Sequence, residues 1–497
     1  MNYMDILKTY AGRMLKEASY PQTPSSLLAD KVDARTHVPL EEEDGHIVSN
    51  AAHQQNFVRF LCGLSALTGE SFYEERALSL MRYMLDRPME GGLLRWGGHR
   101  YLDLKTLTDR GEKGFVHELK NDYPDYELMF QADPAKAELY IKSFWNAHVY
   151  DFDAFEMGRH SMEKPYGVEG IWERRFGDPP ALMPRKGLSF RNTGNDLMYA
   201  AGKLWEQKED QGALTWAEHI FGMYQKSRHP KTHLGAYMFS QAEKQMDTDD
   251  DTITLSMYGD RAKRQLGPEF GDAALEAWVL RANQEQTIYA MSPQIIAACY
   301  SHGSETEKRI VDGTVENMRA FARYAWDGER QVFRPLLADG TDLTGFELKR
   351  PGYYGPKGRV IESHRPAGDY LLAWVGMALL TEDEELWKIE HSLEKALGLT
   401  DEAGRPNENC ACTDSGVLLA LIKLCEHGHM QYLPLAEKIA ENIVSAYYVD
   451  GYFRKKDSTY ARLNTIEPLA LLKLEALKAG IPGMVADPIY GRSSGCE

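Results

Sequence analysis

The sequence is poor in cysteine, has no long apolar run and carries no surplus of positive charge. Six cysteines in 497 residues are too few for a disulfide-stapled scaffold, and we expect a reducing, cytoplasmic setting. No window approaches the roughly 18 apolar residues that a membrane-spanning helix requires. The first 20 residues have the spacing of an amphipathic helix and not the pattern of a secretory signal.

Acidic residues outnumber basic ones, with 74 Asp plus Glu against 57 Lys plus Arg and a formal net charge of -17. Proteins that bind nucleic acid or anionic membranes rely on surplus basic surface to displace counterions. The composition therefore predicts neither nucleic acid nor membrane as a partner. An anionic ligand would have to meet local clusters of basic residues.

Apolar residues recur with the 3.6-residue period of amphipathic helices along most of the chain. The helices come in pairs joined by short polar turns, and such pairs bury their apolar faces most simply as packed hairpins. The pattern predicts an all-α fold, an α/α toroid, in one catalytic domain over 1–497. Besides the N-terminal helix, we expect helices at 53–68, 73–85, 134–148, 195–206, 213–226, 273–282, 304–326, 369–380, 382–397, 415–426, 433–447 and 467–479.

Three irregular stretches interrupt the helical pattern, near 91–126, 150–191 and 332–366. The first two are rich in Gly, Trp, Tyr, Arg and His. Long connections of this composition are where a helical scaffold carries its functional groups. The first two stretches supply imidazoles and carboxylates, among them His99, His117, Glu118, Glu156 and His160. Two imidazoles and a carboxylate from separate segments could meet around a divalent transition metal, because nitrogen and oxygen donors of this kind suit Mn, Fe, Ni or Zn better than Ca. In a chain with 15 histidines, spacing alone does not establish that such a trio meets.

Several short motifs stand in a characteristic order along the chain. They are the run NAAHQQNF at 50–57, the Gly97-Gly98-His99 loop, the Gly158-Arg159-His160 triplet, and the late segments ADGTDLTG at 338–345 and GYYG at 352–355. As an ordered set that covers most of the chain, they resemble polysaccharide lyase family 2. These enzymes are pectate lyases.

The resemblance implies an (α/α)7 barrel that cleaves α-1,4-linked polygalacturonate or oligogalacturonides by β-elimination to 4,5-unsaturated products. Among the family's members, the chain is similar to the exo-acting, disaccharide-releasing kind. The resemblance also implies a divalent transition metal, with Mn²⁺ preferred and Co²⁺ or Ni²⁺ possible, held by His99, Glu118 and His160. Arg159 would be the base that removes the C5 proton.

An arginine base poses a chemical difficulty, because its pKa lies above about 12 and it is normally charged in proteins. Nearby cations and burial would disfavour the charged form. The alternative is that Arg159 stays a cation, binds a substrate carboxylate, and leaves proton abstraction to another group.

A second arginine is also part of the family's site, and Arg261 is our assignment for it. The alternative is that Arg261 belongs to a solvated basic face with Lys263 and Arg264. The loops supply further candidates for binding an acidic sugar through charge or ring stacking, with core or surface positions as the alternatives. These candidates are Arg175, Lys186, Tyr353 and Tyr354.

Two other classes of function fit the helical pattern. One is another α/α-barrel sugar enzyme, either a glycoside hydrolase with paired carboxylates or an epimerase with two histidines. The other is a non-catalytic helical repeat protein that binds an acidic sugar or a protein partner. Neither would form a product with a new double bond.

Overall fold

The computed structural model describes residues 2–97, 100–111, 117–119, 121–161, 167–243, 260–401 and 403–490. The chain forms two compact units, each built from segments that are distant in sequence. Unit 1 comprises Met1–Ala147, His160–Glu169 and Gly398–Glu497, and unit 2 comprises His148–Arg159 and Gly170–Leu397. The single catalytic domain expected from the sequence stays a prediction.

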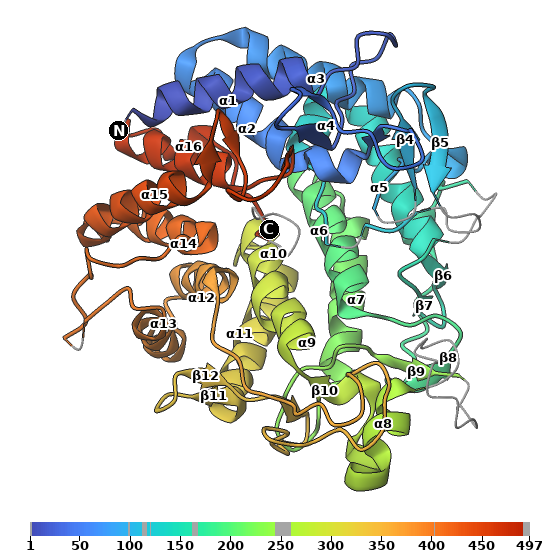
Figure 1. Ribbon diagram of the computed structural model, residues 1–497. Coiled ribbons are helices and arrows are strands. Elements are labelled where there is room, and N and C mark those ends of the chain that lie inside the picture. The colour runs from blue at the N-terminus through green and yellow to red at the C-terminus, as the bar shows by residue number, and fades with distance from the viewer. Residues whose placement is uncertain are drawn as a thin grey trace. The chain divides into compact units, whose positions relative to one another are not determined.

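Unit 1 joins the two ends of the chain, because α16 packs against both α1 and α2 (Figure 1). Consecutive helices also pack as pairs, α2 with α3 and α14 with α15. The helices of this unit are α1 (Tyr3–Glu17), α2 (Gln55–Thr68), α3 (Ser71–Leu85), α4 (Tyr126–Ala132), α5 (Pro134–His148), α14 (Ser415–Glu426), α15 (Leu433–Tyr447) and α16 (Glu467–Lys478).

Unit 2 has the same construction, with α6 packed on α7 and α12 on α13, while α10 contacts both α6 and α12. Its helices are α6 (Arg191–Lys208), α7 (Gln211–Lys226), α8 (Arg261–Phe270), α9 (Ala282–Gln286), α10 (Ser292–Cys299), α11 (Glu305–Ala325), α12 (Gly368–Thr381) and α13 (Glu384–Ala396).

The strands are short and belong to the loops between helices. In unit 1 they form the antiparallel sheets β16-β1-β2 (Tyr460–Arg462, Lys31–Asp33, Val38–Pro39) and β3-β4-β5 (Val48–Ser49, Arg100–Asp103, Thr108–Gly111), and the pair β14-β15 (Tyr448–Val449, Tyr452–Phe453). In unit 2 they form the antiparallel pairs β6-β7 (Val149–Asp151, Glu156–Met157), β10-β13 (Val279–Leu280, Leu336–Leu337) and β11-β12 (Trp326–Asp327, Val332–Phe333), and the parallel pair β8-β9 (Met183–Arg185, Ser240–Ala242).

The predicted all-α class, with irregular or short β insertions, is confirmed. The prediction of a helix at 273–282 is wrong. The chain there instead forms two short 3₁₀ turns, Gly271–Ala273 and Glu276–Trp278, and the second is followed directly by β10. Gly271 has φ +59° and turns the chain away from α8, and the Glu276 amide donates to the side chain of Asp260. Among the described residues, no helix has the length and apolar character needed to cross a membrane.

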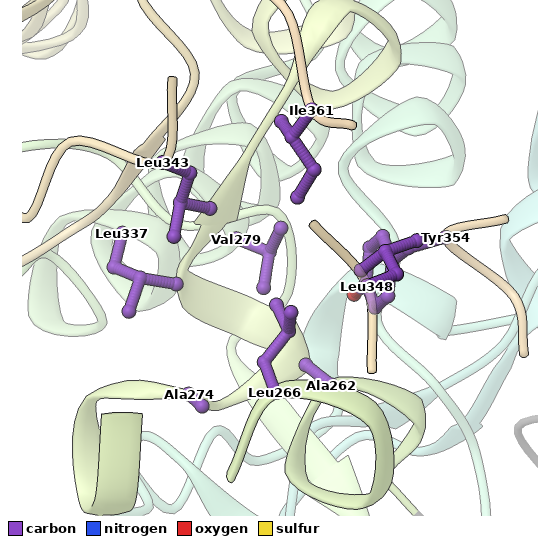
Figure 2. Packing of buried hydrophobic residues seen from close by; sticks show 9 residues of the cluster. All are labelled: Ala262, Leu266, Ala274, Val279, Leu337, Leu343, Leu348, Tyr354 and Ile361. Atoms are coloured by element: carbon purple, nitrogen blue, oxygen red, sulfur yellow. The ribbon is translucent and has the colours of Figure 1, made fainter. Parts of the chain in front are cut away.

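A buried apolar cluster in unit 2 fixes α8 on the loops that follow it (Figure 2). Ala262 and Leu266, on the buried face of α8, pack in this cluster with Tyr354. The remaining members are Ala274, Val279, Leu337, Leu343, Leu348 and Ile361. Burial of such side chains contributes about 25 cal/mol per Å². The cluster therefore holds the first turn of α8 and the 353–354 loop in fixed positions.

Candidate active site and metal centre

Backbone contacts within unit 1 bring the loops of the predicted metal ligands together. Gly97 has φ +77°, and a side chain at this position would overlap the backbone carbonyl of Glu118. The amide of Ser161 donates to the backbone carbonyl of His117 over 3.1 Å. The three loops therefore meet along one short stretch of chain.

Two further hydrogen bonds hold the first of these loops. Asn50 Nδ2 donates to the carbonyl oxygen of Gly97 over 2.6 Å, and the buried indole of Trp96 donates to the carbonyl oxygen of Asp122 over 3.2 Å. Trp96 is fully buried. Its indole therefore holds the loop by packing in the core and does not face a ligand.

Glu118 and His160 are described, whereas His99 lies outside the described residues. The Glu118 side chain is buried and His160 is half-buried. Burial of a charged carboxylate is costly unless it is paired or binds a cation. A buried carboxylate and an imidazole on loops that meet supply oxygen and nitrogen donors of the kind that suits Mn²⁺, Co²⁺ or Ni²⁺, so the residues present fit a divalent transition metal.

The β6-β7 hairpin of unit 2 presents Arg159. The amide of Gly158 donates to the carbonyl of His148 over 3.1 Å, and the carbonyl of Gly158 lies 3.0 Å from His148 Nδ1. A side chain at position 158 would overlap the Tyr150 hydroxyl. Arg159 follows this fixed glycine and is exposed, and the next residue in the chain is His160.

Arg261 is the first residue of α8 and is held on two sides. Its Nε donates to Glu276 Oε1 over 2.7 Å, and its guanidinium carbon lies 3.3 Å from the ring centroid of Tyr353. Burial alone would lower the pKa of Arg261, but the Glu276 carboxylate outweighs it and raises the pKa above its ordinary value. Arg261 is therefore a permanent cation. Its pairing with Glu276 excludes the predicted alternative of a solvated basic face.

The structure brings the two arginines to the same aromatic ring. The guanidinium carbons of Arg159 and Arg261 lie 5.7 Å and 5.9 Å from the ring centroid of Phe190. Both also act on the hydroxyl of Tyr237: burial raises the pKa of Tyr237, and the two cations oppose that rise. This group of Arg159, Arg261, Phe190, Tyr237 and Tyr353 is called the arginine cluster below.

The other predicted substrate-binding residues differ in their placement. Lys186 is exposed and precedes Gly187, whose amide donates to Glu156 of β7, so it lies beside the hairpin. Arg175 pairs with Asp153 at the tip of the hairpin, the end opposite Arg159. Tyr354 is buried in the apolar cluster of Figure 2 and does not offer its ring to a sugar.

Three members of this arrangement were not found from the sequence. Glu276 was placed in the helix predicted at 273–282, where an acidic residue is expected to face solvent. No sequence motif marks Phe190 or Tyr237. Glu390, His391 and Glu394 of α13 form a separate group whose possible ligand atoms lie within 4.8 Å of one another. There His391 Nδ1 pairs with Glu390 Oε2 at 2.6 Å.

A family model described as periplasmic pectate lyase matches residues 25–494. This chain belongs to that family. Over 473 residues it is 33% identical to the pectate disaccharide-lyase of Dickeya dadantii (strain 3937), which covers 91% of this chain and 85% of that protein. The predicted family membership is confirmed.

Solved structures of low sequence identity also resemble the chain. A D-mannose isomerase is 10% identical and covers 81% of this chain and 87% of its own, with a TM-score of 0.45. Cellobiose 2-epimerase from Bacillus thermoamylovorans B4167 is 9% identical and covers 96% of this chain and 100% of its own, with a TM-score of 0.43.

Proposed function

We propose that this chain is a metal-dependent pectate lyase that cleaves α-1,4-linked galacturonate chains by β-elimination. The family match and the pectate disaccharide-lyase relative support this activity and an exo-acting, disaccharide-releasing mode. The structural observation that carries the proposal is the placement of Arg159 and Arg261 at one aromatic ring. Such a cluster offers cationic and aromatic surface to an acidic sugar in a chain of net charge -17.

The residues divide the chemistry between them. Arg261, fixed by Glu276, donates hydrogen bonds to a galacturonate carboxylate, while Tyr353 supports its guanidinium plane. As the base, Arg159 must act in its neutral form: it takes the C5 proton and becomes a guanidinium cation. His99, Glu118 and His160 hold the divalent transition metal, which when bound neutralises the substrate carboxylate and stabilises negative charge that develops next to it.

A lyase assay tests the activity against its rivals. Purified protein is incubated with polygalacturonate and with tri- and tetragalacturonate, and the ultraviolet absorbance of the 4,5-unsaturated product is followed. We expect absorbance to rise, to disappear after chelation, and to return more fully with Mn²⁺, Co²⁺ or Ni²⁺ than with Ca²⁺. Hydrolysis, epimerisation or binding without turnover would each leave the absorbance flat and would refute the proposal.

Product analysis tests the mode of cleavage. An exo-acting enzyme releases unsaturated digalacturonate from the first turnovers, whereas an endo-acting enzyme first produces a mixture of lengths. Early appearance of long unsaturated oligomers would contradict the exo-acting mode.

We also propose a cytoplasmic location, on the basis of the low cysteine content. The matching family is described as periplasmic. Cell fractionation with marker enzymes for each compartment distinguishes the two. Recovery of the protein with the periplasmic marker would contradict our proposal.

A further inference from the structure

A histidine outside the predicted site forms a buried-acid pair beside the metal-ligand loops of unit 1. His53 Nδ1 lies 2.6 Å from Asp30 Oδ2, and the other oxygen of Asp30 accepts the amide of Asn50 over 2.7 Å. The Asp30 side chain is 5% exposed, whereas that of His53 is 42% exposed. One end of the imidazole is therefore fixed by a buried acid while the ring reaches solvent.

The second ring nitrogen of His53 is available. Within the described part of the chain, Nε2 makes no hydrogen bond. The geometry of the imidazole is that of an acid–base catalyst whose orientation is set by a third group.

Asn50 connects this pair to the candidate metal centre. Its side chain holds the carbonyl of Gly97, the residue that packs against Glu118, and its own carbonyl accepts the amide of His53 over 3.0 Å. The His53 imidazole thus stands one short helical turn from the residue that fixes the Gly97 loop. The metal-ligand loops and the imidazole belong to one connected part of unit 1.

Charges around the imidazole keep it protonated. Burial alone would lower the pKa of His53, but Asp30 outweighs it, and the pKa is raised to about 9. Asp122 adds to the rise and Arg462 of β16 opposes it. At neutral pH the ring is therefore an imidazolium with a proton on Nε2.

β-Elimination requires such a proton at a specific place. When the C5 proton leaves, its electron pair forms the C4–C5 double bond, and the C4–O bond breaks with its electrons passing to the glycosidic oxygen. An unprotonated sugar alkoxide is a poor leaving group, and a positioned acid contributes about 10²–10⁴-fold.

We propose that His53, oriented by Asp30, donates its Nε2 proton to the departing glycosidic oxygen. This inference rests on the proposed lyase function. The neutral imidazole left after transfer regains its proton from water. Asp30 is a positioning residue, because it acts through the ring.

The principal test is His53→Gln, assayed with trigalacturonate at saturating Mn²⁺. The amide removes the transferable proton, so kcat should fall about 100-fold with KM changed less than about threefold. Bound Mn²⁺ per chain should stay unchanged, which shows that the metal centre is intact. Retention of more than half of the wild-type kcat, or a loss confined to KM, would overturn the proposal.

Chemical rescue and pH dependence supply independent readouts. Imidazole added to His53→Ala should restore activity. His37→Ala serves as the matched control, because His37 is also about half exposed (45%) and lies 3.7 Å from an acid, Glu17.

In the wild type, kcat should decline as pH rises through about 9. Asp30→Asn should move that decline to lower pH, and an unmoved profile would contradict the assignment. An inactive wild type would refute the lyase function itself, whereas an active wild type with a fully active His53→Gln would refute only this inference.

Discussion

The charged partner of Arg261 is one buried acid, Glu276, whose side chain is 3% exposed. In Glu276→Gln the guanidinium loses its charged partner, and we expect the free energy of unfolding to fall by about 3 kcal/mol, as for other broken buried pairs. The KM for trigalacturonate should rise, because Arg261 is no longer held in place. The matched control is Asp272→Asn, which removes the fully exposed partner of Lys263 on the same helix and should leave KM unchanged. Equal KM values for both variants would contradict the positioning role.

Arg159 is distinguished from a simple cation by its lysine variant. Arg159→Lys keeps the positive charge but not the guanidinium, so kcat should fall by about 10³-fold if Arg159 is the base. Arg175→Lys is the matched control, because exposed Arg175 pairs with Asp153 at the tip of the hairpin that carries Arg159. It should stay within about twofold of wild type, as expected for a solvated ion pair. A rise in KM with kcat preserved would instead identify Arg159 as a carboxylate-binding residue.

At the scale of elements, the close approach of the Gly97 loop to Glu118 determines whether a metal centre forms. Gly97→Ala adds a methyl group that overlaps the Glu118 carbonyl, so the loop must move and bound Mn²⁺ per chain should drop. Gly91→Ala is the matched control, because Gly91 has a similar φ of +78° but nothing within 4 Å of the added methyl group. Both variants carry about 1–2 kcal/mol of backbone strain. Only Gly97→Ala should lose metal, and equal metal contents would refute the contact.

Long helices could be predicted closely from the sequence, and shorter ones could not. The ranges 134–148 and 433–447 match α5 and α15 at both ends, and 415–426 matches α14 although most of that helix is buried. α10 was missed because it has only 8 residues, and α8 was missed because Pro268 is typical of a helix end. Local pattern therefore identifies helices of several turns and fails where the helix is short or tolerates proline.

The candidate site was only partly accessible from the sequence for a related reason. Ordered motifs around Arg159 and His160 identified the family, which the comparisons confirm. Glu276 lies 15 residues after Arg261 and meets it only because the chain turns back at Gly271. Pairings that depend on such turns leave no local signature. The roles of His99, Glu118 and His160 stay predictions.

For the whole molecule, metal binding should be visible as stability. A ligand that binds only the folded state stabilises it by about 2.7 kcal/mol at 100 times its dissociation constant. Adding Mn²⁺ to the chelated protein should therefore raise the melting temperature in calorimetry. Glu118→Ala should abolish the shift, while Glu390→Gln, in the separate acidic group on α13, should preserve it. A shift lost in Glu390→Gln and kept in Glu118→Ala would place the metal on α13.

The Arg261–Glu276 pair also bears on how a polyanion is recognised by an acidic protein. Since the guanidinium carries its own counterion, it adds little to long-range attraction and acts mainly through the fixed direction of its N–H groups. Screening by added salt should therefore weaken the contribution of exposed Lys186 far more than that of Arg261. Discrimination of the uronate by Arg261 is expected to persist at ionic strengths that abolish electrostatic steering.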